Sequence, residues 1–206
     1  MNNDIHSYRV AEGHGLRHDP IPSIVGPRPI GWISTIDEAG TLNLAPYSFF
    51  NIVNYHPPIV AFSSVGRKDT VRNAAASLEF VCNLATRALA EKVNLTSRSV
   101  LPDADEFALA GLTPAASVVV RPPRVAESPA ALECRVVKIE QLCGIDGILL
   151  DTWLVLGEVV AVTIDKAFLN NDLYDTGAAR PILRAGGPAD YFEVTPQSLF
   201  QMRRPD

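Results

Sequence analysis

The sequence predicts a mainly β domain with helical insertions, organised as an antiparallel sheet or barrel. Three observations predict this class. Short segments rich in β-branched and aromatic residues recur along the chain, with only a few helical segments between them. Strands and helices do not alternate in the order typical of a parallel α/β fold. No GxGxxG motif follows the first predicted strand, which argues against a Rossmann nucleotide site.

Composition indicates an ordinary globular protein of one large domain. The chain has 206 residues, of which 47% are hydrophobic and 20% charged. A net charge of −5 argues against a nucleic-acid-binding surface. Three cysteines without CxxC spacing favour a reducing compartment, so we expect a cytoplasmic protein. Acidic residues interrupt the longest apolar stretch, 144–162, so we expect no membrane span. The N-terminus has no basic region followed by an apolar segment, so we expect no signal peptide.

The N-terminal stretch differs from the rest of the chain. Residues 1–20 are polar and carry His6, His14 and His18. These three histidines suggest a metal site, but the stretch shows no strand or helix periodicity that would bring them together. We therefore expect an exposed N-terminal arm at 1–20 and a single domain at 21–206.

The first half of the chain predicts a hairpin, a buried strand and a helix. Gly40 ends a probable turn between two β-rich segments. Ile59–Phe62 is continuously apolar, and Asp69 is a suitable N-cap for the segment that follows. We expect strands at 30–36, 41–44 and 59–62, a helix at 71–76 and a strand at 79–84.

The second half predicts two short helices and several strands. Leu89 and Val93 are four residues apart, as on one helix face, and Gly111 would end a helix. Asp103, Asp105 and Glu106 suggest a solvated start for that second helix. Gly157 would turn the chain between two apolar strands. We expect helices at 87–95 and 103–110, and strands at 117–120, 131–137, 148–155 and 158–164.

A candidate phosphate site follows the strand 59–62. A bound phosphate requires backbone N–H groups, hydroxyls and cations close together. Ser63 and Ser64 end the strand, Arg67 and Lys68 supply positive charge, and Thr70 lies at the predicted helix start. A solvated loop before a capped helix is an equally good interpretation of this spacing alone.

The segment Asn43–Asn51 could contact a flat ring. Ala45 and Ser48 are small enough to allow close approach to the backbone, and Asn43 offers both a donor and an acceptor. Tyr47, Phe49 and Phe50 could stack on the ring, although core packing is the commoner fate of phenylalanine. Together the two segments predict a site for a flat aromatic ligand that carries a phosphate. No GxSxG motif supports a serine hydrolase.

At these residues the chain resembles the flavin reductase-like family, the FMN-binding split barrels that include flavoredoxin and the reductase components of two-component monooxygenases. The likeness extends over roughly residues 28–191, and its segments occur in the family's order. The resembling segments are 28–35, 43–51, 57–58, 68–70 with Asn73, 80–83, 107–112, 127–129, 132–134 and 181–184.

The resemblance implies a six-stranded antiparallel Greek-key split barrel that forms a homodimer. It also implies two groups of flavin-contacting residues. Those along the ring and ribityl chain would be Ser34, Thr35, Asn43, Leu44, Ala45, Pro46, Tyr47 and Ser48. Those at the phosphate would be Ser63, Ser64, Arg67, Lys68 and Thr70.

The resemblance further implies reduction of FMN by NADH or NADPH, with FAD as a possible flavin. An alternative is an electron-transfer protein that holds FMN tightly and serves a monooxygenase or another acceptor. A third is a barrel whose flavin site has been lost. In the first two cases no protein side chain needs to be catalytic, because the hydride is accepted by N5 of the flavin.

Overall fold

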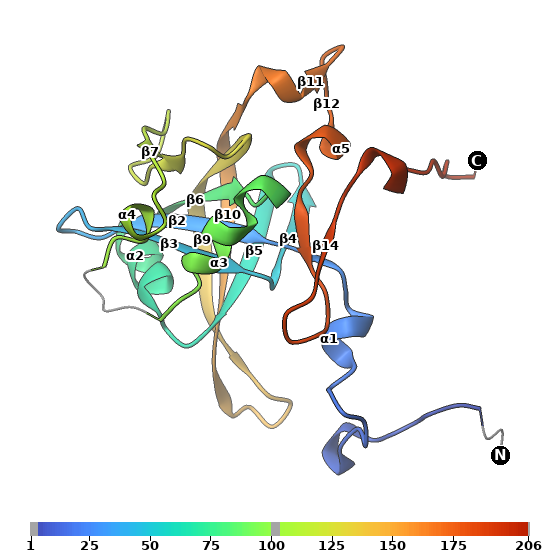
Figure 1. The fold of residues 1–206 in the computed structure, drawn as a ribbon. Coiled ribbons are helices and arrows are strands. Elements are labelled where there is room, and N and C mark those ends of the chain that lie inside the picture. The colour runs from blue at the N-terminus through green and yellow to red at the C-terminus, as the bar shows by residue number, and fades with distance from the viewer. Residues whose placement is uncertain (1–3, 100–103, 206) are drawn as a thin grey trace.

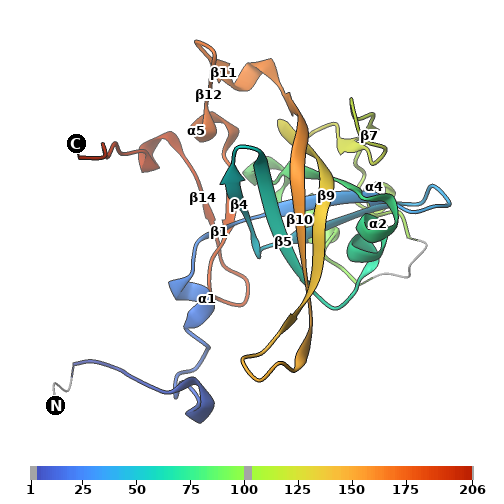
Figure 2. The same ribbon diagram turned by 180° about the vertical axis from the view of Figure 1, so that it is seen from behind.

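The main body is a seven-stranded antiparallel sheet with the strand order β3-β2-β6-β9-β10-β5-β4. The computed structural model describes residues 4–99 and 104–205 (Figures 1 and 2). The mainly β class with helical insertions is confirmed, although the main sheet has seven strands where six were expected. Its strands are β2 (Gly31–Ile36), β3 (Leu42–Tyr47), β4 (Phe50–Tyr55), β5 (Pro58–Val65), β6 (Glu79–Leu84), β9 (Ala130–Cys143) and β10 (Leu149–Ile164).

The two edges of this sheet are consecutive in the chain. β3 and β4 are separated only by Ser48 and Phe49, yet they lie at opposite ends of the strand order. The sheet therefore curls back on itself into an incompletely closed barrel, and β3 comes into contact with β5. Pro46 lies in β3, as expected for an edge strand, because proline has no N–H to donate to a neighbouring strand.

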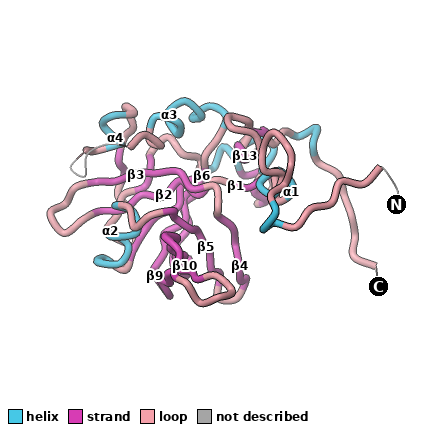
Figure 3. The backbone as a smooth tube through the Cα atoms, turned by 90° about the horizontal axis from the view of Figure 1, so that it is seen from below, coloured by secondary structure: helices cyan, strands magenta, loops and turns pink. Residues whose placement is uncertain are grey.

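Smaller elements surround the barrel. Figure 3 shows α3 and α4 along one side of β2, β3 and β6. The helices are η1 (Val10–Glu12), α1 (Ile21–Ile24), α2 (Asp69–Ser77), η2 (Arg87–Leu89), α3 (Ala90–Leu95), α4 (Glu106–Leu109), η3 (Lys166–Phe168), α5 (Thr176–Ala179) and η4 (Pro196–Ser198). The short strands are β1 (Arg28–Pro29), β7 (Pro114–Ala115), β8 (Arg124–Val125), β11 (Leu169–Asn170), β12 (Leu173–Tyr174), β13 (Ile182–Arg184) and β14 (Tyr191–Glu193). No helix in the described ranges is long and apolar enough to cross a membrane.

The strand β2 is buried on both faces. Trp32 packs in one hydrophobic cluster with Leu44 and Phe107, whereas Ile33 packs in another with Phe62 and Phe80. Successive side chains of a strand point to opposite faces, so one strand contributes to both clusters. This explains why residues 31–36 form an almost uninterrupted run of buried positions.

The predicted turn at Gly157 is wrong, because this residue lies inside the single long strand β10. A Cβ atom at Gly157 would lie 2.4 Å from the ring of Phe80. Glycine is therefore required here by the close packing of Phe80 and not by a change in chain direction. The chain turns earlier, between β9 and β10, where Gly147 has a φ of +78°.

The predicted strand at 117–120 is also wrong. The backbone N–H groups of Val118, Val119 and Val120 donate to the carboxylate of Glu133, at 2.7, 2.6 and 3.2 Å. Glu133 is fully buried. Its carboxylate takes the place of a neighbouring strand as hydrogen-bond acceptor, so the apolar run remains a loop.

Most other elements are confirmed, with some shifts at their ends. The hairpin of β2 and β3 pairs Ile36 with Leu42, and the helix at 87–95 forms as η2 and α3. Asp69 is the first residue of α2 and not its N-cap, which is Lys68, and the Asp69 carboxylate pairs with Arg72. Asp105 caps α4 instead, accepting from the N–H groups of residues 107 and 108. Part of the helix predicted at 103–110 lies outside the described residues.

One strand of the main sheet was not predicted. The strand β4 has a mostly exposed sequence, FNIVNY, without the alternation that indicates a half-buried strand. The N-terminal arm and the C-terminal segment both extend away from the body (Figures 1 and 2). In the described part of the arm, His6 Nε2 lies 2.8 Å from the carbonyl oxygen of His14. The division of the chain at residue 20 stays a prediction.

Candidate ligand-binding site

A buried polar network joins three of the predicted site residues. Asn43 Nδ2 donates to Thr35 Oγ1 at 3.0 Å and to Thr70 Oγ1 at 2.9 Å. Asn73 Nδ2 also donates to Thr35 Oγ1, at 3.3 Å. The network ties β2, β3 and the start of α2 together, so the segment that precedes α2 is held against the edge strand.

A cavity of about 360 Å³ opens beside this network, between β3, the start of α2 and the loop after α3. We call it the Lys68 cavity. Its volume is within the range of small-molecule sites, roughly 300–1,000 Å³. It is lined by Asn43, Ala45, Pro46, Tyr47, Lys68, Asp69, Thr70, Arg72, Thr96, Ser97, Arg98, Ser99 and Glu106.

The Lys68 cavity has an excess of positive charge. Of its three cations, Arg72 pairs with Asp69. In residues 4–99 and 104–205, neither Lys68 nor Arg98 has an ion-pair partner. Lys68 precedes the nine-residue helix α2, whose N-terminal N–H groups also favour an anion. This end of the cavity is therefore suited to a phosphate.

Glu106 forms part of the opposite wall. Its side chain is buried, with 6% exposure, and accepts a hydrogen bond from the N–H of Leu44 at 3.0 Å. Burial raises the pKa of the Glu106 carboxyl, and the bond from Leu44 opposes part of that shift. The prediction of a solvated helix start is wrong for this residue, because α4 packs directly on β3.

The hydroxyl of Tyr47 is buried and has no hydrogen-bond partner among the described residues. Burial raises the pKa of this phenol, while the nearby hydroxyls of Thr70 and Ser64 act in the opposite direction. The ring lies 5.0 Å from that of Phe62, which fixes its position. A buried donor without a partner is unusual in a folded protein, and here it lies at a cavity.

Two other predicted site residues, Ser34 and Leu44, point away from the Lys68 cavity, because successive side chains of a strand alternate between its two faces. Ser34 Oγ donates to the carbonyl oxygen of Pro123 at 2.6 Å, on the side of β2 opposite Thr35. The Leu44 side chain packs in the cluster with Trp32. Neither side chain lines the Lys68 cavity.

The residues predicted to bind a phosphate before α2 do not all line the Lys68 cavity either. Ser64 Oγ donates to the carbonyl oxygen of Gly66 at 2.8 Å, and Ser63 lines a different cavity. The guanidinium of Arg67 lies 5.3 Å from the ring centre of Trp153 and does not line the Lys68 cavity. Ser48 is half-buried and lines neither cavity.

The structure adds residues that the sequence interpretation missed. Arg72 follows Lys68 by four residues, so helical spacing could have identified it. The residues 96–99 and Glu106 reach the cavity only through the packing of α3 and α4, and no local pattern identifies them.

Comparison with known proteins supports a flavin-related fold. Residues 26–183 match the model of the flavin reductase like domain. An uncharacterised protein of Aquifex aeolicus is 38% identical over 170 residues, covering 80% of this chain and 83% of that protein. Component B of nitrilotriacetate monooxygenase from Bacillus cereus has a similar structure, with a TM-score of 0.84, 28% identity and coverage of 97% and 100%. Flavoredoxin of Desulfovibrio vulgaris superposes with a TM-score of 0.74, 25% identity and coverage of 86% and 90%.

Proposed function

The chain belongs to the flavin reductase-like family, and from this premise we propose that it catalyses the reduction of FMN by NADH or NADPH. One observation carries the proposal beyond family membership. Two cations without ion-pair partners among the described residues, Lys68 and Arg98, line a cavity beside the start of α2. That combination suits the phosphate of a small ligand.

The residues present fit FMN. Lys68, Arg98 and the hydroxyl of Thr70 would hold the phosphate, with Arg72 contributing its remaining donors. The outer edge of β3 would receive the ring, because an edge strand has backbone groups that no neighbouring strand uses. The unpartnered hydroxyl of Tyr47 offers one further donor. A cavity of about 360 Å³ suits a mononucleotide better than the larger FAD.

When bound, the flavin would supply hydride acceptance at N5, and the protein would supply binding and orientation. Ala45 and Pro46 would allow the ring to lie close to the backbone of β3. Glu106 holds that strand through the N–H of Leu44 and so keeps the wall in place. The roles of Ser34, Leu44, Ser48, Ser63, Ser64 and Arg67 in flavin binding stay predictions.

We also propose a cytoplasmic homodimer that passes reduced flavin to an acceptor. The similarity to a monooxygenase component B supports an oxygenase as that acceptor. The exposed apolar residues of the edge strand β4, including Ile52, Val53 and Tyr55, support a second copy as the neighbour of that edge.

Steady-state oxidation of NADH and NADPH with added FMN tests the reductase. We expect turnover with one donor to depend on FMN and to fall strongly in Lys68→Ala. A matched control is Lys138→Ala, because Lys138 pairs with Glu140 on an exposed part of β9. Absence of turnover with both donors would exclude a nicotinamide-dependent reductase.

The structural similarity to flavoredoxin favours a second candidate, an electron-transfer protein that retains its flavin. Such a protein would be yellow after gel filtration and would not be reduced by either nicotinamide. A reductase that uses FMN as a substrate would release the flavin and be colourless after gel filtration. Anaerobic absorbance spectra before and after addition of NADH or NADPH separate the two.

A further inference from the structure

A second cavity, of about 540 Å³, lies between α1, β1, β4 and β5. We call it the Arg28 cavity. It is lined by Ile24, Val25, Gly26, Pro27, Arg28, Pro29, Phe49, Phe50, Asn51, Ala61, Ser63 and Leu154. None of these residues lines the Lys68 cavity. The two cavities are nevertheless near each other along the chain, since Tyr47 lines one, Phe49 lines the other and only Ser48 intervenes.

The lining of the Arg28 cavity carries a single charge. Arg28 is its only ionisable lining residue, so no carboxylate of the cavity neutralises it. Its Nη1 donates to the carbonyl oxygens of Pro22 and Val25, the latter at 3.1 Å. Its Nε is buried and has no partner among the described residues. Both of these bonds come from Nη1, so Nη2 has donor capacity left for a ligand oxygen.

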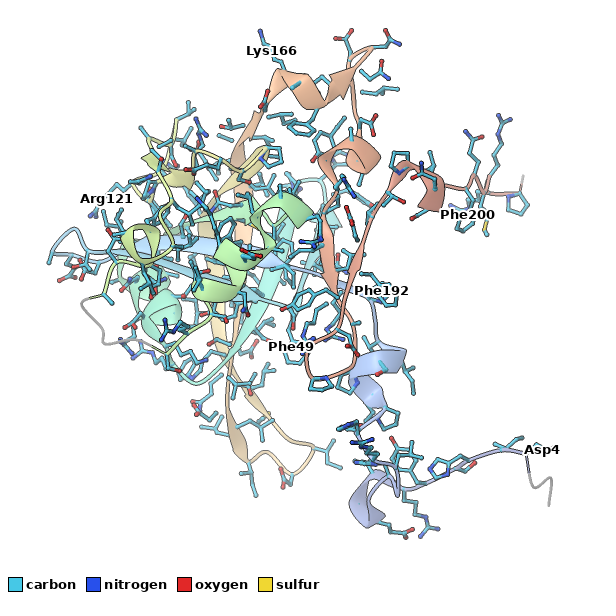
Figure 4. The ribbon with its side chains drawn as sticks, viewed as in Figure 1. Asp4, Phe49, Arg121, Lys166, Phe192 and Phe200 are labelled. Carbon is cyan, nitrogen blue, oxygen red and sulfur yellow. The ribbon has the colours of Figure 1, made fainter. Side chains whose placement is uncertain are left out.

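The rest of the wall is mostly apolar and includes two aromatic rings. The Arg28 guanidinium lies over the ring of Phe49, 5.5 Å from its centre. Phe50 packs so closely on β2 that a Cβ atom at Gly31 would lie 2.6 Å from its ring, which holds that ring firmly in place. Phe49, which is labelled in Figure 4, lines the cavity and is by contrast 52% exposed. Asn51 and Ser63 add uncharged polar groups at the wall.

We propose that the Arg28 cavity binds a small aromatic monocarboxylate. The aromatic ring packs against Phe49 and Phe50, and the carboxylate accepts hydrogen bonds from Arg28. One cation matches one negative charge, whereas a nucleoside diphosphate would bring charge that nothing in this lining neutralises. Binding of the carboxylate does not depend on the proposed function.

Calorimetric titration of the full chain with benzoate tests the proposal. Benzamide is the uncharged control ligand of the same shape, and acetate is the control that has the carboxylate but no aromatic ring. We expect benzoate to bind at least tenfold more tightly than either. Arg28→Leu should remove the preference for benzoate over benzamide. Equal affinity of the wild type for benzoate and benzamide, or no binding of benzoate, would overturn the proposal.

Arg28 also contacts the carbonyl oxygens before it, so its replacement could unfold the chain. Phe49→Ala avoids this difficulty because its side chain is half exposed. This variant should weaken benzoate and benzamide by a similar factor, about fivefold to tenfold. The matched control is Phe192→Ala, since Phe192 is 58% exposed on β14 and does not line the Arg28 cavity. An equal loss in both variants would overturn the assignment of the site.

A parallel titration with FMN keeps this proposal separate from the flavin function. Lys68→Ala should weaken the binding of FMN and leave the affinity for benzoate unchanged. Phe49→Ala should leave unchanged the ratio of the affinities for FMN and riboflavin, which differ by the phosphate. Binding of benzoate in a protein that does not bind FMN would support the carboxylate site and remove only the flavin function. One-for-one displacement of benzoate by FMN would show a single shared site and overturn the proposal of a separate one.

Discussion

The Lys68 cavity and the Arg28 cavity are lined by residues that flank Ser48 in the sequence, Tyr47 and Phe49, but the two cavities are charged differently. The Lys68 cavity has three cations and two acids in its wall, and one of these cations is paired with an acid. The Arg28 cavity has one cation and no acid. Its remaining wall is dominated by proline, aliphatic and phenylalanine side chains.

This difference indicates what each cavity can select. A phosphate monoester carries about −1.5 to −2 charge at neutral pH, so it needs more than one cation together with neutral donors. A single half-buried guanidinium suits one negative charge on an otherwise apolar molecule. The two cavities thus offer distinct chemistry, because acidic residues line only the Lys68 cavity.

The largest expected effect concerns charge in the Lys68 cavity. Lys68→Ala should weaken FMN by roughly 10- to 150-fold, the equivalent of a charge-assisted contact of about 1.5–3 kcal/mol. Arg67→Ala should have a smaller effect, because Arg67 lies over Trp153 and outside the cavity. Fluorescence titration measures both, and riboflavin, which lacks the phosphate, is the control ligand. Equal losses for FMN and riboflavin would show that the phosphate is bound elsewhere.

The next largest effect is expected for Glu106, in the free energy of unfolding. Glu106→Ala leaves the N–H of Leu44 without its acceptor, at a cost of about 1–3 kcal/mol in the free energy of unfolding. Glu106→Gln retains a carbonyl acceptor and should lose less. Urea denaturation of the two variants and the wild type measures the difference. If both variants lose the same amount, the hydrogen bond to Leu44 does not stabilise this wall.

The same residue predicts a pH dependence. Burial raises the pKa of Glu106 above its ordinary value, so the folded protein binds the proton more tightly than the unfolded chain does. The contribution of Glu106 to the free energy of unfolding is therefore full below the ordinary glutamate pKa and decreases as the pH rises through the raised value. The wild type should lose stability relative to Glu106→Gln across that window, in denaturation measured from about pH 4 upward. A constant difference between the two proteins would contradict the raised pKa.

The smallest effect is expected for Tyr47→Phe. Because the hydroxyl has no partner among the described residues, its removal should change the free energy of unfolding by less than about 1 kcal/mol and could increase it. Thermal unfolding without ligand measures this change. If the hydroxyl donates to bound FMN, the same variant should weaken FMN by several-fold, so the unliganded and FMN-bound proteins would respond differently. A large destabilisation without ligand would mean that the hydroxyl already has a partner.

Local patterns were sufficient for elements that depend on neighbours in the chain. The hairpin of β2 and β3 and the buried strand β5 follow from a turn glycine and an apolar run. The helix α2 forms where it was expected, although Asp69 does not cap it. The patterns misled where a distant group satisfied or displaced the backbone. Glu133 holds residues 118–120 as a loop, and Phe80 requires the glycine that was interpreted as a turn.

The candidate site divides in the same way. Asn43, Ala45, Pro46, Tyr47, Lys68 and Thr70 were predicted from the sequence and line one cavity. Ser34, Ser63 and Arg67 were predicted from the same stretches, yet their side chains lie elsewhere. A strand sends alternate residues to opposite faces, and the sequence does not show which face will meet a cavity.

Local sequence patterns were enough to predict the β class, the likeness to a flavin-binding family and the basic residues before α2. Those features depend on local propensity and on segments kept in a fixed order. The folded chain was needed to show that Arg98 and Glu106 line one cavity with Lys68, and that Arg28 is the one charged residue lining a second cavity beside Phe49 and Phe50. Contacts of that kind depend on how β3, α3, α4 and α1 pack, and residues far apart in the chain carry no local signal of the packing that brings them together.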